Sequence, residues 1–347
     1  MANNAADFTI AANDEYGIPP CRSPVMPYIN RSIYANEFTT AVKLRFLQAL
    51  LRTGFEVFDA HPEPVNLPDG AIASRINGRR PERFVTFGYN SYGSGGVFTR
   101  ASGFETQYCP HNHFSHAGRA FCEDIAFSLE ENTLTGGCSP ESDTDLLRLS
   151  NCVCARLLAG YASDYSDAAR MLDPDFQISV AESAAKAVCL NLDVPFVERE
   201  KLSAYKTLRL GDMGKGVRLL QYLLAFEGYE TAKDGIFGRR TESALNLFRK
   251  DNSLSEGTVA DEAVYRKLLC FDVAATVFSA APSCALRYVQ RKLAAKLYDV
   301  NCDGIYGEKT EAALSDFQKD NALRQTGIPD GDTVAALKTA PPRPRLY

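Results

Sequence analysis

The residues Asp-Gly-Ile-Phe-Gly at 234–238 recur as Asp-Gly-Ile-Tyr-Gly at 303–307, an offset of 69 residues. The same offset relates the flanking residues, where Thr241-Glu242, Ala244-Leu245 and Lys250-Asp251-Asn252 match Thr310-Glu311, Ala313-Leu314 and Lys319-Asp320-Asn321. The offset stays at 69 residues throughout, from Leu220 in the first copy to Leu337 in the second. Duplication of one structural unit therefore explains this part of the chain.

Each repeat has the pattern of a small helical bundle. Val217, Leu220 and Leu224 follow the spacing of one face of an amphipathic helix. The Asp-Gly pair that comes next favours a turn, because glycine adopts positive φ at little cost. Thr241 is the predicted N-cap of a second helix, and a short third helix ends at Leu268. The repeats thus predict two all-α three-helix modules, at 205–271 and 280–339, of about 60 residues each.

Three features of the repeat point to a known family. They are Leu-Arg-Leu-Gly-Asp at 208–212, the Asp-Gly turn, and the Thr-Glu-x-Ala-Leu-x-x-Phe helix. Together they closely resemble the peptidoglycan-binding domain family, which implies that a shallow groove binds glycan or stem peptide. The second copy has Ala-Pro-Ser-Cys at 281–284 instead of the opening motif, so the first copy is the better candidate for an intact site.

Candidate binding residues in the modules are chosen by their chemistry. Carbohydrate sites favour aromatic rings and donors that form two hydrogen bonds at once. On this ground the glycan-binding candidates are Tyr229, Arg239, Arg240, Tyr298 and Lys309.

The first 200 residues predict an α/β domain in which helices and strands alternate. Residues 36–52 form an amphipathic helix that ends at Gly54, and residues 55–58 form a short strand. Further strands are expected at 83–87, 104–108 and 153–161, and further helices at 114–129 and 175–190.

Several short motifs follow one another in this region. They are Ile-Pro-Pro-Cys-Arg-Ser-Pro at 18–24, Tyr-Ala-Asn-Glu-Phe-Thr at 34–39, Phe-Val-Thr-Phe-Gly-Tyr-Asn at 84–90, Gly-Phe-Glu-Thr at 103–106 and Leu-Leu-Ala-Gly-Tyr at 157–161. Their order and spacing resemble the zinc-dependent N-acetylmuramoyl-L-alanine amidase family, in its Gram-positive and phage-type branch. The resemblance implies a twisted, mostly parallel sheet flanked by helices over residues 1–200.

The resemblance places the family's catalytic positions on residues that lack the necessary chemistry. Such an amidase needs His, Glu and His around zinc, with an open position for water, and a Glu as general base. These positions fall on Asp14, Ala35, Tyr89 and Leu158, and Glu37 is an alternative counterpart of Ala35. Alanine and leucine can neither ligate a metal nor accept a proton. The sequence therefore predicts no intact catalytic residue and no zinc cofactor.

Histidines and cysteines offer two weaker hypotheses. A replacement metal site could form from His111, His113 and His116, although a polar loop that enters a helix is the simpler interpretation. A nucleophile at Cys152 or Cys154 lacks a histidine at a supporting spacing. Most cysteines are expected to be buried thiols. A pairing among Cys270, Cys284 and Cys302 would require an oxidising compartment.

The composition of the 347-residue chain is that of a globular protein, with 45% hydrophobic and 23% charged residues. A net charge of −5 and the lack of a basic patch argue against a nucleic-acid partner. No apolar run approaches the ~20 residues that span a bilayer. The first residues show no secretory signal. We therefore expect a bacterial or phage protein that is associated with the cell wall and is cytoplasmic before its release.

Three classes of function fit these observations. The leading hypothesis is a non-catalytic peptidoglycan-binding protein built on a degenerate amidase domain. The first alternative is an active amidase or endolysin with a rearranged metal site. The second is a structural component of a phage or spore coat.

Overall fold

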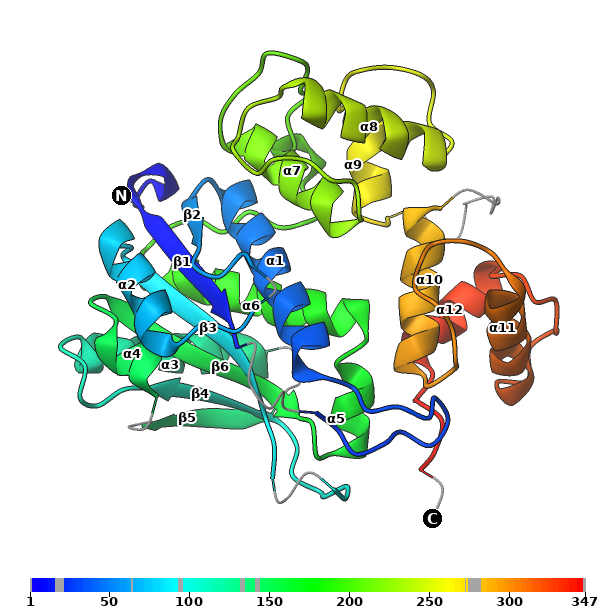
Figure 1. Ribbon diagram of the computed structural model, residues 1–347, viewed down its shortest axis with the longest axis horizontal. Coiled ribbons are helices and arrows are strands. Elements are labelled where there is room, and N and C mark those ends of the chain that lie inside the picture. Colours follow the sequence, from blue (N-terminus) through cyan, green and yellow to red (C-terminus); the bar gives the residue numbers. More distant parts are fainter. Residues whose placement is uncertain are drawn as a thin grey trace. The chain divides into compact units, whose positions relative to one another are not determined.

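The structure of the 347-residue chain is a computed structural model (Figure 1). It describes residues 2–15, 22–63, 65–92, 96–131, 135–140, 144–271, 273 and 282–345. Part of the motif at 18–24 lies outside these residues. The chain divides into two compact units, of which the first comprises Met1–Val25, Ser32–Met171 and Asp175–Arg199, and the second Met26–Arg31, Leu172–Pro174 and Glu200–Tyr347. The finer division into 1–200, 205–271 and 280–339 stays a prediction.

The first unit is built on a six-stranded sheet with the order β2-β1-β3-β6-β4-β5. Its strands are β1 (Thr9–Asp14), β2 (Glu56–Asp59), β3 (Arg83–Asn90), β4 (Phe104–Tyr108), β5 (Gly136–Pro140) and β6 (Val153–Tyr161). All neighbouring strands run parallel except β4 and β6, which are antiparallel. This confirms the predicted mostly parallel sheet.

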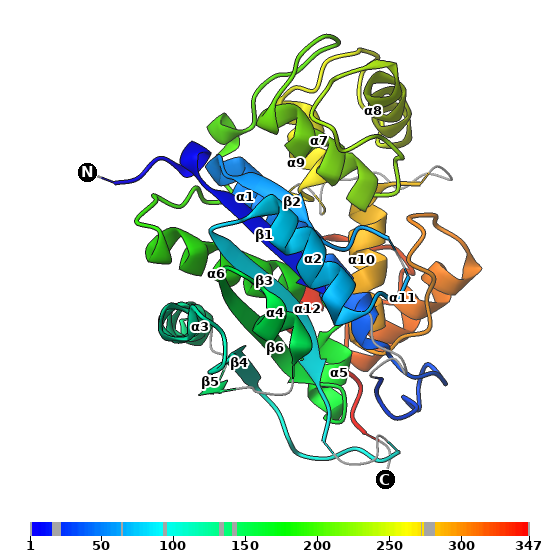
Figure 2. The same cartoon turned by 60° about the vertical axis from the view of Figure 1, so that its left-hand side comes forward.

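Helices flank this sheet. They are α1 (Ala35–Thr53), α2 (Asp69–Arg79), α3 (Ser115–Glu130), α4 (Asp145–Leu149), α5 (Tyr165–Arg170) and α6 (Pro174–Asn191). Helix α1 runs alongside β1, β2 and β3, whereas α3 lies against β4, β5 and β6 (Figures 1 and 2). Gly54 ends α1 with a φ of +107°, which confirms the predicted stop.

The sequence predicted seven elements of the first unit and missed five. The predicted helices and strands agree with α1, α3, α6, β2, β3, β4 and β6 apart from shifts at their ends. The missed elements are β1, β5, α2, α4 and α5. Strand β5 reads Gly-Gly-Cys-Ser-Pro and α4 has five residues, so neither contains a recognisable apolar period.

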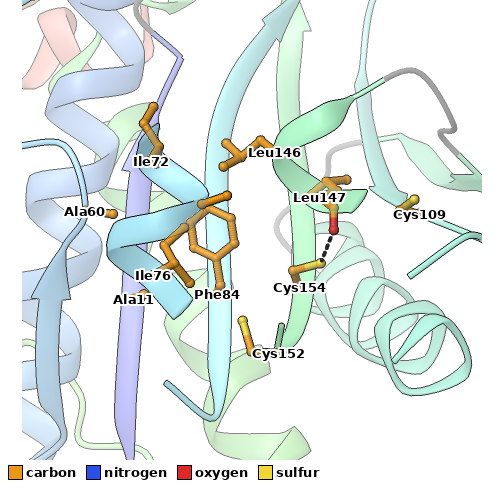
Figure 3. Packing of buried hydrophobic residues seen from close by; sticks show 11 residues of the cluster. Ala11, Ala60, Ile72, Ile76, Phe84, Cys109, Leu146, Leu147, Cys152 and Cys154 are labelled. Carbon is orange, nitrogen blue, oxygen red and sulfur yellow. Dashed lines mark hydrogen bonds between the residues drawn. The ribbon is translucent and has the colours of Figure 1, made fainter. Parts of the chain in front are cut away.

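A hydrophobic core lies between the sheet and the helices α2 and α4 (Figure 3). Phe84 and Cys154 project from the strands toward Ile76 of α2 and Leu147 of α4. The Cys154 thiol donates a hydrogen bond to the carbonyl of Leu147 at 3.6 Å. Burial raises the pKa of the neighbouring Cys152 thiol to about 12. Both thiols therefore belong to the core, and a nucleophilic role has no support here.

The second unit contains two three-helix modules, as predicted. The first module has α7 (Lys215–Phe226), α8 (Arg239–Asp251) and α9 (Glu262–Leu268). The second has α10 (Cys284–Ala295), α11 (Glu308–Asp320) and α12 (Gly331–Thr339). The second module encloses its own core, in which Leu293, Leu314 and Phe317 are fully buried.

One buried glutamine organises each module. The Gln221 amide donates to the Ile236 carbonyl at 3.0 Å and to the Thr241 hydroxyl at 3.1 Å, and it accepts from Gly235 N at 2.8 Å. Gln290 forms the equivalent bonds in the second module. The prediction that Thr241 caps α8 is therefore wrong. The N-cap is Gly238, and Thr241 lies in the first turn, where its hydroxyl is bonded to Gln221.

Two further observations concern the described part of the chain. No helix there is both long and apolar enough to cross a membrane.

The nine cysteines in the described part of the chain are free thiols. Among the three considered for pairing, the Cys270 thiol donates a hydrogen bond to the Cys284 carbonyl at 3.6 Å.

Candidate functional site

The first candidate site is a pocket of about 280 Å³ in the first unit, at the carboxyl end of β1. Along the chain, β2 is added on one side of β1 and β3 on the other, and open α/β sheets bind ligands where the strand order reverses in this way. The pocket is lined by residues of β1, β6, α2, α4 and the connecting segments. They are Asn13, Asp14, Glu15, His61, Asn66, Leu67, Asp69, Ile72, Thr144, Leu146 and Arg156.

A buried group of charges surrounds Asp14, one of the residues that line this pocket. The Lys43 ammonium of α1 lies 2.8 Å from Asp14 Oδ1 and 2.9 Å from Asp59 Oδ1. It also donates to the His61 carbonyl at 2.6 Å, and the Thr40 hydroxyl donates to Asp14 Oδ2. Lys43 is only 2% exposed and Asp14 only 3%. Both Asp14 oxygens are therefore engaged by partners within the protein.

Strand register separates Asp14 from Leu158. In the sheet Asp14 aligns with Phe87, and Phe87 aligns with Leu157. Aligned residues share one face and successive residues alternate, so Leu158 projects to the face opposite Asp14. On that opposite face Arg156 of β6 forms an ion pair with Glu15, with Nη2 at 2.7 Å from Oε2.

Tyr89 lies on the α1 side of the sheet. Its ring packs edge-on against Phe38 with 5.3 Å between centroids. Gly160, with a φ of +136°, makes room for it, because a Cβ there would lie 2.6 Å from the tyrosine oxygen. Ala35 is the first residue of α1 and is buried. The structure thus places Asp14, Ala35 and Tyr89 on the α1 side of the sheet, whereas Leu158 is on the opposite side.

Gly88, the residue before Tyr89, lies on the opposite face of β3. It shares the face of Leu158, with which it is aligned in the sheet. A Cβ at Gly88 would lie 2.5 Å from Glu15 Oε2 and 2.6 Å from Leu158 Cδ2. The packing on this face therefore leaves no room for a side chain at Gly88.

The residues at these positions do not fit a zinc ion. Ala35 and Leu158 supply no donor atom, and an ammonium already neutralises the carboxylate of Asp14. Glu37 instead accepts a hydrogen bond from the backbone N–H of Tyr34, the N-cap of α1, at 2.9 Å, as part of a capping box. In the described ranges no group of three or more His, Cys, Asp and Glu side chains has a geometry that could hold a metal.

The histidine cluster lies on the surface around one buried residue. His111, His113 and His116 are exposed, while Asn112 between them is buried. The Asn112 amide donates to the carbonyls of Leu147 and Ser150 at 2.8 and 2.7 Å. Asn112 thus anchors this loop to the segment that contains Leu147 and Ser150, which is a structural role.

The second candidate site is a groove of about 490 Å³ on the first module, which we call the α8 groove. It is lined by Gly228, Tyr229, Glu230, Arg239, Arg240, Ser243, Ala244 and Leu247. The structure thus brings together the three candidates Tyr229, Arg239 and Arg240. Ser243 and Leu247 were not among the candidates, although both follow Arg239 and Arg240 at helical spacing on the same face of α8.

The two candidate arginines are accessible, whereas the tyrosine is mostly enclosed. The Arg239 side chain is 86% exposed and lies 3.5 Å from Glu242. Tyr229 is 5% exposed, with its ring edge-on against Phe248 and its hydroxyl bonded to Asp251 at 3.1 Å. Tyr229 therefore shapes the groove, and Arg239 and Arg240 supply its donors.

The second module carries different chemistry at the same place. Tyr298 is buried and bonded to Asp320 at 2.9 Å, as Tyr229 is to Asp251. Lys309, the counterpart of Arg240, lies 3.2 Å from Asp299. The counterparts of Arg239 and Leu247 are Glu308 and Asp316. Three carboxylates and one lysine in the second module thus stand where the α8 groove has one glutamate, two arginines and one leucine.

Both parts of the chain match known protein families. The N-acetylmuramoyl-L-alanine amidase family matches residues 26–189. A putative peptidoglycan binding domain matches twice, at residues 213–268 and 285–337. No curated protein matches the chain.

Several solved structures are similar to the first unit. The amidase Ami1 from Mycobacterium smegmatis is 16% identical, with a TM-score of 0.45, over 55% of this chain and 99% of that one. The catalytic domain of CwlV from Bacillus (Paenibacillus) polymyxa var. colistinus is 22% identical, with a TM-score of 0.45, over 54% and 100%. CwlD from Clostridioides difficile, solved with the GerS lipoprotein, is 16% identical, with a TM-score of 0.46, over 53% and 98%.

Proposed function

Residues 26–189 match the N-acetylmuramoyl-L-alanine amidase family, and from this premise we propose that the chain binds peptidoglycan without hydrolysing it. A cell-wall function related to that of the amidases follows from this domain. Peptidoglycan as the partner follows from the two binding domains behind it. The absence of hydrolysis is the new element of the proposal.

The chemistry at the carboxyl end of the sheet supports this element. Hydrolysis of an amide requires a metal or another group to activate water, and a base to take its proton. Lys43 neutralises the Asp14 carboxylate, and Ala35 on the same side of the sheet has no donor atom. Leu158 lies on the other face and carries no proton acceptor. The Lys43–Asp14 ion pair is the observation on which the proposal chiefly rests, because it puts a cation where the family would need ligands for one.

The test is to incubate the full chain with purified peptidoglycan and Zn²⁺ and to count newly exposed L-alanine amino termini. We expect no release above that from heat-inactivated protein, and less than stoichiometric zinc in the protein after dialysis. A matched Asp14→Asn variant should give the same result. Zinc-dependent release that disappears in Asp14→Asn would overturn the proposal in favour of an active amidase with a rearranged site.

Binding itself is proposed to depend on the α8 groove. We expect Arg239→Ala/Arg240→Ala to weaken retention of the full chain on peptidoglycan sacculi by about tenfold, since hydrogen bonds from charged groups contribute ~1.5–3 kcal/mol each before solvent screening reduces them. Co-sedimentation at several sacculus concentrations measures the change.

A control variant separates groove chemistry from overall charge. Lys206→Ala/Lys250→Ala removes two positive charges from exposed positions of the same module that do not line the groove. It should bind as the unchanged chain does. Equal weakening in both double variants would show that retention reflects net charge, and the α8 groove would lose its assigned role.

A further inference from the structure

The segment after α12 lies on the second module at the place that corresponds to the α8 groove. Arg343 is stacked on the Tyr298 ring, with its guanidinium carbon 3.9 Å from the ring centroid. Its Nε donates to Asp320 Oδ2 at 3.0 Å, and its Nη2 lies 3.7 Å from Asp316 Oδ2. The Arg343 backbone N–H donates to the Lys296 carbonyl at 3.2 Å.

The internal repeat shows that these contacts fall on groove positions. Tyr298 and Asp316 are the counterparts of Tyr229 and Leu247, which both line the α8 groove. In the first module Leu247 is 52% exposed and the groove is open. The same place on the second module is therefore occupied by a side chain of the protein itself.

The chemistry of this place suits a cation. An aromatic face attracts a guanidinium or ammonium through its quadrupole, and two carboxylates, Asp316 and Asp320, lie beside it. The side chains of Asp316 and Asp320 are 62% and 43% exposed, whereas that of Arg343 is 20% exposed. Ion pairs this exposed are weak, so a competing cation can displace the arginine.

We propose that the second module holds a cation-binding site, formed by Tyr298, Asp316 and Asp320, and that residues 340–345 act as a strap whose Arg343 fills it as an internal ligand. The external ligand is an ammonium group carried by a peptide, of the kind that a diamino acid in a wall peptide presents. The identity of this external ligand rests on the proposed peptidoglycan function, whereas the internal site does not. The two modules then bind different parts of one polymer, and the strap keeps the second site closed until such a peptide competes for it.

The test uses Nα-acetyl-L-lysinamide as the probe, because it has one ammonium group and no carboxylate. Full-length protein with ¹³C-labelled tyrosine rings is titrated by NMR, and the Tyr298 signal is assigned from Tyr298→Phe. We expect Arg343→Ala to bind the probe about fivefold more tightly than the unchanged chain, which corresponds to ~1 kcal/mol. Arg343→Ala/Asp320→Asn should lose this gain.

Two controls keep the outcome clear. Lys338→Ala removes a positive charge from the end of α12 without touching the site, and it should bind the probe as the unchanged chain does. In the unchanged chain, the probe should speed hydrogen exchange of the Arg343 amide. This measurement needs no substitution, so it tests the strap even if Arg343→Ala disturbs folding. Equal affinities in Arg343→Ala and the unchanged chain, or no effect on exchange, would overturn the strap.

Sacculus binding separates this inference from the proposed function. If the probe results hold but neither the unchanged chain nor Arg343→Ala binds sacculi, the cation site stands and the peptidoglycan ligand is wrong. If the unchanged chain and Arg343→Ala bind sacculi equally and neither binds the probe, the proposed function stands and the strap is wrong.

Discussion

Replacing Lys43 by methionine is expected to lower the free energy of unfolding of the first unit by ~3–5 kcal/mol, because breaking a buried ion pair leaves the remaining charges uncompensated. Lys43 is the only cation within 4 Å that the described residues offer to both Asp14 and Asp59. Both carboxylates are almost fully enclosed, with side-chain exposures of 4% and 7%. Urea denaturation of the full chain, followed by far-ultraviolet circular dichroism, measures the change.

The control variants test whether charge or packing causes the loss. Lys43→Met/Asp14→Asn/Asp59→Asn removes all three charges and should recover most of the stability. Arg75→Met breaks the ion pair with Glu63 on the surface, where the partners are 38% and 44% exposed, and should change the free energy of unfolding far less than Lys43→Met. If Lys43→Met costs no more than Arg75→Met, the cluster contributes little to the fold.

Replacing Gln221 by leucine is expected to destabilise the first module by ~3 kcal/mol. The substitution leaves Gly235 N and the Ile236 carbonyl without their bonds to the amide, and each unsatisfied buried group costs ~1–3 kcal/mol. Gly235 has a φ of +77°, so the turn that it forms depends on being held in place by this amide. Hydrogen exchange of the Gly235 amide and thermal unfolding followed by calorimetry both report the loss.

The repeat supplies the matched comparison for this prediction. Gln290→Leu should have a similar effect in the second module, because Gln290 forms the same set of bonds. Gln325→Leu changes an exposed glutamine and should leave unfolding almost unchanged. Stability preserved in both Gln221→Leu and Gln290→Leu would mean that water replaces the amide, and the glutamines would then not organise the modules.

The predicted destabilisation has a bearing on function. The turn held by Gln221 leads directly into Arg239 and Arg240 at the start of α8. Loosening the turn should therefore weaken sacculus binding as well, even though Gln221 does not line the α8 groove.

The modules were largely readable from the sequence because their determining contacts are local. The bonds of Gln221 to Gly235 and Thr241 span 14 and 20 residues, within one repeat. Comparing two copies of the unit also separates the residues that both need, such as Gln221 and Gln290, from those that differ, such as Leu247 and Asp316. Three residues of the α8 groove could therefore be predicted from their chemistry alone.

The sheet of the first unit was harder to read because its contacts connect distant parts of the chain. Strand β1 pairs with β3 more than 70 residues away, and Thr-Ile-Ala-Ala-Asn-Asp has no alternating pattern that would reveal it. The motifs predicted which residues stand at the catalytic positions. They did not predict the faces on which Asp14 and Leu158 lie, since a face follows from strand register.

By itself, the sequence determined the duplication, the two three-helix modules, the mostly parallel α/β domain and the missing donor groups at Ala35 and Leu158. Only the tertiary structure decided that Lys43 neutralises Asp14 and that Arg343 fills the second module's site. The physical reason is that identity and local periodicity are properties of the chain. Burial of a charge and occupation of a groove depend instead on residues brought together from separate segments, such as Asp14 with Lys43 and Tyr298 with Arg343.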